Sequence, residues 1–410
     1  MSEQEILRSR VLSRLDMSRD IEDDDLFEII DEAIVEEGKN RYIKLENKVR
    51  LRKELYDSIR GLDVLQEILE MPDVTEIMVN GPENIFIEKE GKILKYNAEF
   101  SSRERLMDLI QQIVSKVNRR VNEASPIVDT RLADGSRINI VLNPIALEGP
   151  IITIRKFPEF RMTMEHLIKL NSINKEAANF LKTLVKSGYN IFVSGGTGSG
   201  KTTFLNALSN YIPKTERIIT IEDSAELQLN GIDNLVRLEV RQANTEGKNE
   251  ITIRELIKAS LRMRPDRIIV GEVRGKEALD MLQAMNTGHD GSLSTGHANS
   301  PMDMISRLEI MVLMGVDMPI SAIKGQIASG LDIIVHLGRL RDKTRRVLEI
   351  VEVIGIENGE VVLSSLYKFN ETGEVKGKIS GELEKTQNSL MNVSKLIAAG
   401  QSLKGENFEN

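Results

Sequence analysis

Three patterns of apolar and polar positions follow one another along the chain, and each predicts a different kind of structure. Residues 1–60 are highly charged and rich in helix formers, and they carry one apolar stripe at helical spacing, formed by Leu26, Ile29, Ile30, Ala33 and Ile34. We expect an N-terminal helical segment here. A partly disordered, solvated tail is the alternative that such a charge density leaves open.

Residues 62–157 show the second pattern, short runs in which apolar and polar residues alternate. The run TEIMVNGPENIFIEKEGKILKY contains the breakers NGP and EG, so it predicts antiparallel strands joined by turns. A helical repeat from Leu106 to Val121 follows, and RINIVLNPIAL and IITIRKF predict two more strands. These elements together predict a compact α+β domain.

Residues 174–370 show the third pattern, in which apolar strands alternate with helices. This order predicts a mainly parallel sheet covered by helices, and it ends in an antiparallel strand meander that starts at DIIVHLGRL. The predicted organisation is a helical segment at 1–60, an α+β domain at 62–157, a linker at 158–173, an α/β domain at 174–370 and a polar C-terminal tail at 371–410.

Composition narrows the class of protein. The net charge of −8 argues against a general nucleic-acid binder, because phosphate contacts need a basic surface. The absence of cysteine excludes disulfides, cysteine zinc sites and thiol catalysis. The N-terminus has no signal-peptide pattern, and no apolar run approaches the roughly 20 residues of a spanning helix. We therefore expect a soluble, cytoplasmic protein that reaches a membrane only through partners.

The strongest motif is YNIFVSGGTGSGKTTFLNAL, in which an apolar strand leads into Gly195-x-x-x-x-Gly200-Lys201-Thr202 and then into an apolar helix. This is a P-loop in its strand–loop–helix context, whose backbone N–H groups cradle phosphate oxygens. We expect Lys201 to reach the β- and γ-phosphates of ATP and Thr202 to hold Mg²⁺. The residues predicted to bind the nucleotide are Gly195, Gly196, Thr197, Gly198, Ser199, Gly200, Lys201, Thr202 and Thr203.

Acidic residues follow two more predicted strands. RIITIEDSAE ends at Glu222 and Asp223, and RPDRIIVGEVRG places Glu272 just beyond its strand. Because ligands of open α/β sheets lie at the carboxyl ends of the strands, these residues are expected beside the P-loop. Gly271 stands where P-loop ATPases usually have aspartate, so Thr202, Asp223 and Glu272 are the predicted metal ligands. Whether Glu222 or Glu272 activates the attacking water stays open.

Two of the four histidines lie in GHDGSLSTGHANSP, residues 288–301. A helix is predicted to end at Gly288, and GSLST is predicted to be a short strand. His297 then lies at the phosphate edge and His289 at the opposite end of the strand. Two histidines and Asp290 lack the spacing of a zinc site. We expect His297 to sense the γ-phosphate, with a purely structural histidine as the alternative, and His289 to be structural or coupling.

The motifs GGTGSGKTT, TIEDSAELQL, RPDRIIVGEVRG and GHDGSLSTGHANSP occur in this order in a known family. The chain resembles the secretion-type ATPases of type II and type IV secretion and of type IV pili. The resemblance is closest to the Tad/Flp pilus assembly ATPases (CpaF-like), through DVTEIMVNGPENIFIEKEGK and VDTRLADGSRIN. It spans about residues 62–370. The family's four-cysteine zinc knuckle of the type II branch is absent, which favours the pilus branch.

The resemblance implies an α/β protein with a PAS-like α+β domain before a RecA-like P-loop ATPase domain, assembled as a homohexamer. It implies ATP and Mg²⁺ as cofactors, with ATP bound between the two domains, and Arg137 and Arg155 as the arginines that reach its phosphates. Arg241, Arg262 and Arg264 resemble sensor or subunit-interface arginines, although a solvated helix face explains the last two equally well. The implied partners are inner-membrane pilus platform proteins, with the motor docked at the inner face of the cell membrane and no nucleic acid.

The sequence therefore favours an ATP-hydrolysing ring motor over two other functions. A RecA-like nucleic-acid translocase is disfavoured because only RLRDKTRR, residues 339–346, is locally basic, and a strand turn explains that run. A binding module that holds ATP as a switch stays open. A GTPase is disfavoured because no NKxD-type motif follows the P-loop. The cargo, and the choice between extension and retraction, are also open.

Overall fold

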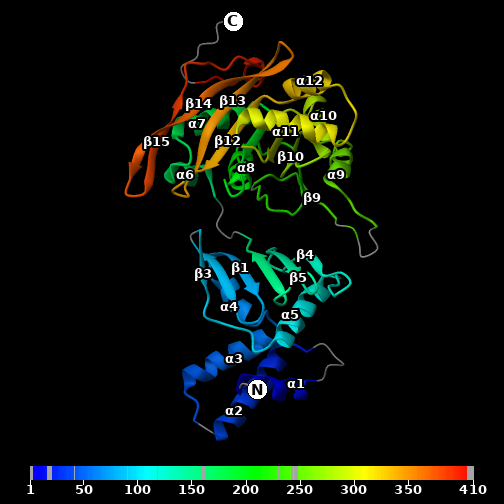
Figure 1. The fold of residues 1–410 in the computed structure, drawn as a ribbon, viewed down its shortest axis with the longest axis vertical. Helices are drawn as coiled ribbons and strands as arrows, with labels where there is room; N and C mark the ends of the chain where they lie inside the picture. Colours follow the sequence, from blue (N-terminus) through cyan, green and yellow to red (C-terminus); the bar gives the residue numbers. More distant parts are fainter. Residues whose placement is uncertain are drawn as a thin grey trace. The chain divides into compact units, whose positions relative to one another are not determined.

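The computed structural model of the 410-residue chain divides into two compact units, Met1–Glu159 and Phe160–Asn410. It describes residues 3–15, 21–40, 42–89, 91–117, 119–157, 162–229, 231–241, 243 and 248–403. Figure 1 shows the helices and strands of both units. No helix within these ranges combines the length and the apolar character that crossing a membrane requires.

The first unit begins with three helices, α1 (Glu3–Arg14), α2 (Asp23–Asn40) and α3 (Leu45–Ile59). They share a small apolar core of their own, to which α2 contributes Leu26 and Ile30 from the stripe predicted in the sequence. Burial of this stripe explains why a segment of such high charge density is helical rather than a solvated tail, because apolar burial offsets the entropy lost on ordering the chain.

The rest of the first unit is the predicted α+β domain. Its six-stranded sheet has the order β3-β2-β1-β6-β5-β4, and every neighbouring pair is antiparallel. Helix α5 buries the apolar face that its three- and four-residue spacing predicts. The elements are α4 (Val64–Glu70), β1 (Val74–Asn80), β2 (Ile85–Lys89), β3 (Lys92–Lys95), α5 (Arg103–Lys116), β4 (Ile127–Arg131), β5 (Arg137–Val141) and β6 (Ile151–Arg155).

The second unit is built on a nine-stranded sheet of the order β15-β14-β13-β12-β7-β11-β10-β8-β9. The part from β12 to β9 is parallel, and β13, β14 and β15 add an antiparallel meander. The strands are β7 (Ile191–Gly195), β8 (Ile218–Glu222), β9 (Leu235–Glu239), β10 (Arg267–Val270), β11 (Leu293–Gly296), β12 (Ile333–Arg339), β13 (Arg345–Glu357), β14 (Glu360–Val375) and β15 (Lys378–Lys385).

Helices cover both faces of the parallel part. Alternate residues of β7 point to opposite faces, so Ile191 and Val193 enter one apolar core and Phe192 enters the other. The first core includes residues of α6, α7 and α8, and the second includes residues of α9, α10, α11 and α12. The helices are α6 (Met164–Lys169), α7 (Lys175–Lys186), α8 (Lys201–Ser209), α9 (Ile253–Ser260), α10 (Glu277–Asn286), α11 (Pro301–Leu313), α12 (Ile320–Gly330) and α13 (Ser394–Ala398).

Two predicted boundaries differ in the structure. Of the predicted linker 158–173, residues 158–161 lie outside the described ranges, and the rest contains α6, whose Met164 and Leu167 are buried in the core of the second unit. The predicted tail 371–410 is also part of this unit as far as it is described. Strand β14 continues beyond residue 370, β15 pairs with it, and Leu383 and Leu396 are buried. A few buried apolar residues are enough to hold an edge strand in a polar segment. The polar composition of residues 371–410 therefore led to the wrong prediction of a tail.

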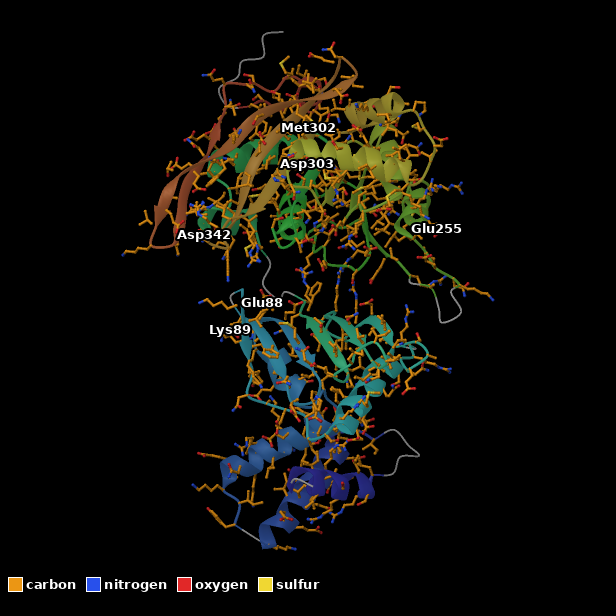
Figure 2. The ribbon with its side chains drawn as sticks, in the orientation of Figure 1. Glu88, Lys89, Glu255, Met302, Asp303 and Asp342 are labelled. Carbon is orange, nitrogen blue, oxygen red and sulfur yellow. The ribbon has the colours of Figure 1, made fainter. Side chains whose placement is uncertain are left out.

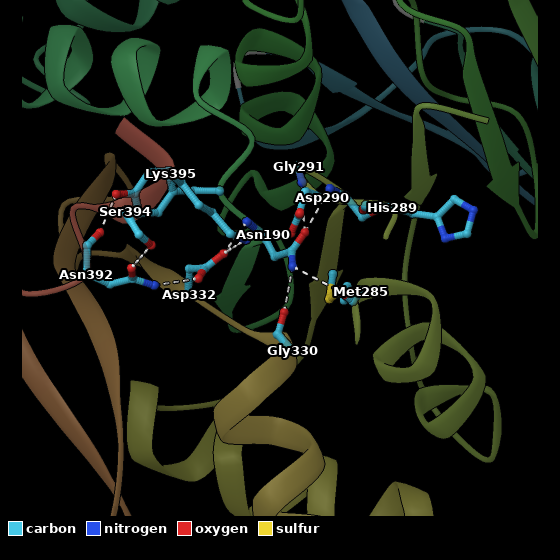
Figure 3. A network of polar contacts seen from close by, with 12 residues as sticks. Asn190, Met285, His289, Asp290, Gly291, Gly330, Asp332, Asn392, Ser394 and Lys395 are labelled. Carbon is cyan, nitrogen blue, oxygen red and sulfur yellow. Dashed lines mark hydrogen bonds and ion pairs between the residues drawn. The ribbon is translucent and has the colours of Figure 1, made fainter. Parts of the chain in front are cut away.

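The amino ends of the central strands are joined by a polar network (Figure 3). The Asn190 side chain accepts hydrogen bonds from Gly291 N at 2.9 Å and Ser292 N at 3.0 Å, and it donates to Gly330 O at 2.8 Å. Lys395, in α13, forms ion pairs with Asp290 and Asp332, each at 2.7 Å. These contacts fix the C-terminal segment to the edge of the sheet opposite the P-loop.

Candidate functional site

The P-loop has the backbone geometry that its glycines predict. All five residues of β7 are buried, and the loop between β7 and α8 leads into a helix whose N-cap, Gly200, is in the left-handed region at φ 93°. Gly195 has φ 153°, and a Cβ built on it would collide with the carbonyl oxygen of Leu337 on β12. Only glycine satisfies both positions without strain, and the result is a loop whose N–H groups lead into a helix N-terminus.

Lys201 opens α8, and its ammonium group is partly buried inside the loop. Its Nζ donates to Gly196 O at 3.1 Å and lies 3.3 Å from His297 Nδ1. Burial lowers the pKa of Lys201, although the carboxylate of Glu272 opposes that shift. Burial removes water from the Lys201 ammonium group, and the neutral carbonyl and imidazole beside it replace that water only in part. An anion bound next to the ammonium group would stabilise its charge.

Beyond Lys201 a chain of polar contacts crosses the edge of the sheet. His297, directly after β11, places Nε2 at 2.7 Å from Glu272 Oε1. Glu272, beyond the end of β10, accepts from Arg274 Nη2 at 2.5 Å through Oε2. Arg274 also lies 3.4 Å from Asp223 Oδ2, after β8. The P-loop and the carboxyl ends of three parallel strands therefore meet in one cluster, as the strand-end argument predicts.

The electrostatics of the cluster determine the state of His297. Burial, and next the neighbouring Lys201, lower the pKa of His297, so the imidazole is neutral at pH 7. In the tautomer with hydrogen on Nε2, Nδ1 accepts from Lys201 and the Nε2 side of the ring lies against the Glu272 carboxylate. His297 thus links the lysine of the P-loop to the acidic residue of β10. His289 lies at the opposite edge, with Nδ1 at 3.3 Å from Ala284 O.

Glu222 is placed differently from Glu272, although both end a strand. Its carboxylate is buried, and Oε2 accepts from the backbone N–H groups of Glu226 at 2.7 Å and Leu227 at 2.9 Å. Burial raises the pKa of Glu222 to about 7. The side chain also fills the space beside Gly271, where a Cβ would lie 3.0 Å from Glu222 Cγ. This crowding explains why residue 271 is glycine rather than aspartate.

The raised pKa of Glu222 predicts a pH-dependent stability. The folded state holds the proton up to about pH 7 and the unfolded state only to about 4.5, so stability falls as pH rises between these values. The loss is about 3 kcal/mol when complete. We expect Glu222→Gln to remove this loss. In denaturant titrations, the free energy of unfolding of the variant minus that of the wild type should therefore increase from pH 5 to pH 8. Glu384→Gln, an exposed change on β15, should track the wild type. If the free energies of unfolding of Glu222→Gln and the wild type differ by the same amount at every pH, the prediction is wrong.

The residues of the loop fit ATP and Mg²⁺. Ser199 Oγ is buried and has no hydrogen-bond partner among the described residues, and nothing lies within 4 Å of a Cβ built on Gly196. Thr202 lies in the first turn of α8, where its hydroxyl can reach a cation beside the phosphates. Within the described ranges no three His, Asp or Glu side chains form a ready cation cage. A Mg²⁺ ion held by few protein groups, phosphate oxygens and water suits such a site.

A hollow of about 450 Å³ extends from the loop along the start of α11. Asp303, which Figure 2 labels in the first turn of α11, belongs to the lining residues. The lining residues are Gly196, Thr197, His297, Ala298, Asn299, Asp303, Ser306 and Arg307. The hollow therefore opens directly onto His297 and the first half of the P-loop.

The predicted arginines lie on other elements. Arg137 and Arg155 face each other across β5 and β6 of the first unit, so their approach to the phosphates stays a prediction. Arg241 forms an isolated bridge with Ile251 and donates to Asn249 O at 2.7 Å. Arg262 and Arg264 follow α9.

Two arginines near the P-loop were missed in the sequence. Arg274 belongs to the motif RPDRIIVGEVRG, and its place two residues after Glu272 was the available signal. Arg345 belongs to the basic run RLRDKTRR, which a strand turn explained. Its Nε donates to Gly198 O of the P-loop at 2.8 Å. A contact between residues so far apart in sequence has no local signal.

Comparisons with known proteins identify the family. The family model for "Type II/IV secretion system protein" matches residues 60–383. The "Putative conjugal transfer protein MT3759" of Mycobacterium tuberculosis is 34% identical over 303 residues, 72% of this chain and 85% of that protein. Conjugal transfer protein TrbB of Rhizobium radiobacter is 30% identical over 337 residues, 81% of this chain and 99% of that protein.

A solved structure supports the same fold. The pilus retraction motor PilT with bound ADP matches with a TM-score of 0.53 at 19% identity, over 83% of this chain and 90% of that one. The family match covers the α+β domain of the first unit and the whole parallel sheet of the second. The chain therefore belongs to the type II/IV secretion system protein family, and its second unit is a RecA-like P-loop ATPase domain.

Proposed function

We propose that the chain is an ATP-hydrolysing motor that powers a type II/IV secretion or pilus machine. The observation that carries the proposal is the chain of contacts from Lys201 through His297, Glu272 and Arg274 to Asp223, because it joins the P-loop to the ends of three strands, β11, β10 and β8. A site of this kind can detect whether a γ-phosphate is present and transmit the difference to the sheet. Hydrolysis of ATP by the purified protein, absent from a P-loop variant, is the direct test.

The roles follow from the contacts. Lys201 and the backbone N–H groups of the loop hold the β- and γ-phosphates. Mg²⁺, when bound beside Thr202, neutralises charge on the phosphate oxygens. Glu272 orients and deprotonates the attacking water, because its carboxylate faces His297, whereas the carboxylate of Glu222 is held by two backbone N–H groups. Asp223 and Arg274 complete the charge balance on the β8 side.

Replacing His297 with alanine is expected to lower ATP turnover by about 10²-fold while leaving nucleotide affinity nearly unchanged. The imidazole contacts both Lys201 and Glu272, so its loss separates the phosphate-binding group from the acidic group. Phosphate release and the binding of a nonhydrolysable ATP analogue would be measured on the full chain. His289→Ala, at the other edge of the sheet, is the matched control. Normal turnover by His297→Ala would leave only the structural role for this residue.

We further propose that the motor is a homohexamer of the Tad/Flp pilus type that docks on membrane platform proteins at the inner face of the cell membrane. The proposal is supported by the resemblance of DVTEIMVNGPENIFIEKEGK and VDTRLADGSRIN to that group, and by the similarity to the pilus retraction motor PilT. In this arrangement Arg137 and Arg155 reach the phosphates of a nucleotide bound to the second unit and couple its hydrolysis to domain movement.

The ring is expected to form when nucleotide is present. Light scattering of the full chain with Mg²⁺ and a nonhydrolysable ATP analogue should give the mass of six protomers, because a head-to-tail interface that closes produces a ring. Hydrolysis per protomer should then rise with protein concentration. A monomer with full activity contradicts the ring, and stimulation of hydrolysis by DNA or RNA would favour the translocase instead.

A further inference from the structure

The turn between β12 and β13 is flanked by strand ends that lie beside the P-loop. Asp342, which Figure 2 labels, shapes this turn. Its side chain accepts from Thr344 N at 3.0 Å and from Thr344 Oγ1 at 2.6 Å. Asp342 also accepts from Ile379 N at 2.9 Å, which ties the turn to β15. The turn is therefore a built part of the ATPase unit, and the arginines that flank it are held in place.

Two of the four arginines in RLRDKTRR are anchored away from the P-loop. Arg341 pairs with Glu371 at 2.5 Å and with Glu374 at 3.0 Å. Arg346 donates to Asn171 O at 2.8 Å and lies over the ring of Phe369. These contacts stabilise the turn, so the turn by itself accounts for Arg341 and Arg346.

The other two, Arg339 and Arg345, face the P-loop. Arg345 Nε donates to Gly198 O at 2.8 Å, and its Cδ lies 3.4 Å from the position that a Cβ on Gly200 would take. The Arg339 guanidinium comes within 3.7 Å of the corresponding position on Gly198. These arginines are directly opposite each other in the ladder of β12 and β13, and both are exposed. Like charges placed opposite each other cost stability, and an anionic ligand beside them relieves that cost.

The order of the strands decides which end of a nucleotide these arginines meet. Strand β7 leads into the P-loop, and it lies between β11 on one side and β12 on the other. His297 and Glu272 follow β11 and β10, so the γ-phosphate belongs on that side. A polyphosphate that crosses the loop toward the N-terminus of α8 then leaves its nucleoside on the β12 side. Arg345 lies on that side, at the outer face of Gly198.

We propose that Arg345, supported by Arg339, binds the nucleoside end of the nucleotide, with its guanidinium packed against the face of the base. The inference rests on the proposed function, since it needs a nucleotide at the P-loop. A planar guanidinium suits this task, because it stacks on aromatic faces while Nε keeps its hydrogen bond to the Gly198 carbonyl. Arg345 thereby makes the β12–β13 turn the wall of the site that distinguishes a nucleotide from bare polyphosphate.

The test compares two ligands on the full chain, a nonhydrolysable ATP analogue and inorganic tripolyphosphate, each with Mg²⁺, by isothermal titration or competition. Arg345→Ala should raise the Kd of the ATP analogue about tenfold and leave that of tripolyphosphate within about twofold. In hydrolysis, KM should rise while kcat stays the same, since the contact is equal in ground state and transition state. Arg341→Ala, on the same turn and of the same charge, should change neither ligand.

A second variant separates the specific contact from general effects. Arg345→Lys keeps the charge but loses the planar group, so it too should weaken binding of the ATP analogue and leave binding of tripolyphosphate unchanged. Thermal unfolding checks that both variants are folded. Equal weakening of both ligands would overturn the proposal, because Arg345 would then act through the charge or shape of the loop. An unchanged affinity for both would also overturn it. These outcomes can be told apart from failure of the proposed function. A wild-type protein that binds the ATP analogue but does not hydrolyse ATP would contradict the proposed function, and the two ligands could still be compared on it.

Discussion

Replacing Lys201 with alanine is expected to reduce ATP turnover by about 10³-fold or more, the largest effect of any single change in the chain. Its Nζ is the cation that the structure holds inside the loop, 3.1 Å from Gly196 O and 3.3 Å from His297 Nδ1. An alanine leaves the developing charge on the transferring phosphoryl group without this partner. It also removes the contact that joins the loop to His297. Phosphate release under saturating Mg²⁺ and ATP measures the effect.

The loss should be specific to this position. Lys182→Ala changes a lysine of α7 that lies over the ring of Tyr211, outside the cluster, and should keep wild-type turnover. Affinity for the ATP analogue should fall in Lys201→Ala, because the lysine contacts phosphate in the ground state as well. Turnover within tenfold of the wild type would show that the P-loop of this chain does not perform hydrolysis.

Glu272→Gln is expected to lower turnover by about 10²- to 10³-fold while the ATP analogue still binds. Glutamine has the shape of glutamate, so its amide oxygen can still accept the hydrogen bond from Arg274. It cannot accept a proton from water, and it no longer balances the charges of Lys201 and Arg274. A variant that binds ATP but does not hydrolyse it should also hold the proposed ring in the nucleotide-bound state.

Two further variants assign the acidic groups. Asp223 lies on the outer side of Arg274, which it approaches to 3.4 Å, so Asp223→Asn should cost less turnover than Glu272→Gln. Glu384→Gln is the control for an exposed charge of the same unit. If Glu222→Gln abolishes turnover and Glu272→Gln does not, the assignment of the general base is wrong and the two glutamates exchange roles.

Much of the fold was predictable from local pattern. The apolar stripe of α2, the alternating runs of the first unit and the buried strands of the second all occur where the sequence predicts them. The exceptions share one cause. Helix α6 has only six residues, and the apolar residues from β15 to α13 are scattered, so both segments are buried only because a completed sheet and helix layer offer them a surface. Such burial depends on distant neighbours and leaves little periodic signal.

The sequence by itself determined the chemistry of the P-loop, because a phosphate cradle depends on consecutive residues. The spacing of Gly195, Gly200 and Lys201 imposes the turn, the helix start and the cation in one segment. The placement of Glu272 and His297 at strand ends was likewise readable, since parallel strands deliver their carboxyl ends to one edge.

Only the tertiary structure decided between groups that are equal in sequence. Glu222 ends a buried strand and Glu272 lies just beyond another. The carboxylate of Glu222 accepts from backbone N–H groups, whereas that of Glu272 lies against His297 and Arg274. Arg345 reaches Gly198 because β12 pairs with β7 and returns through a tight turn, which no spacing along the chain encodes. The order of residues within a segment specifies what that segment can bind. The pairing of strands that are distant in the sequence specifies which side chains contact the bound ligand together.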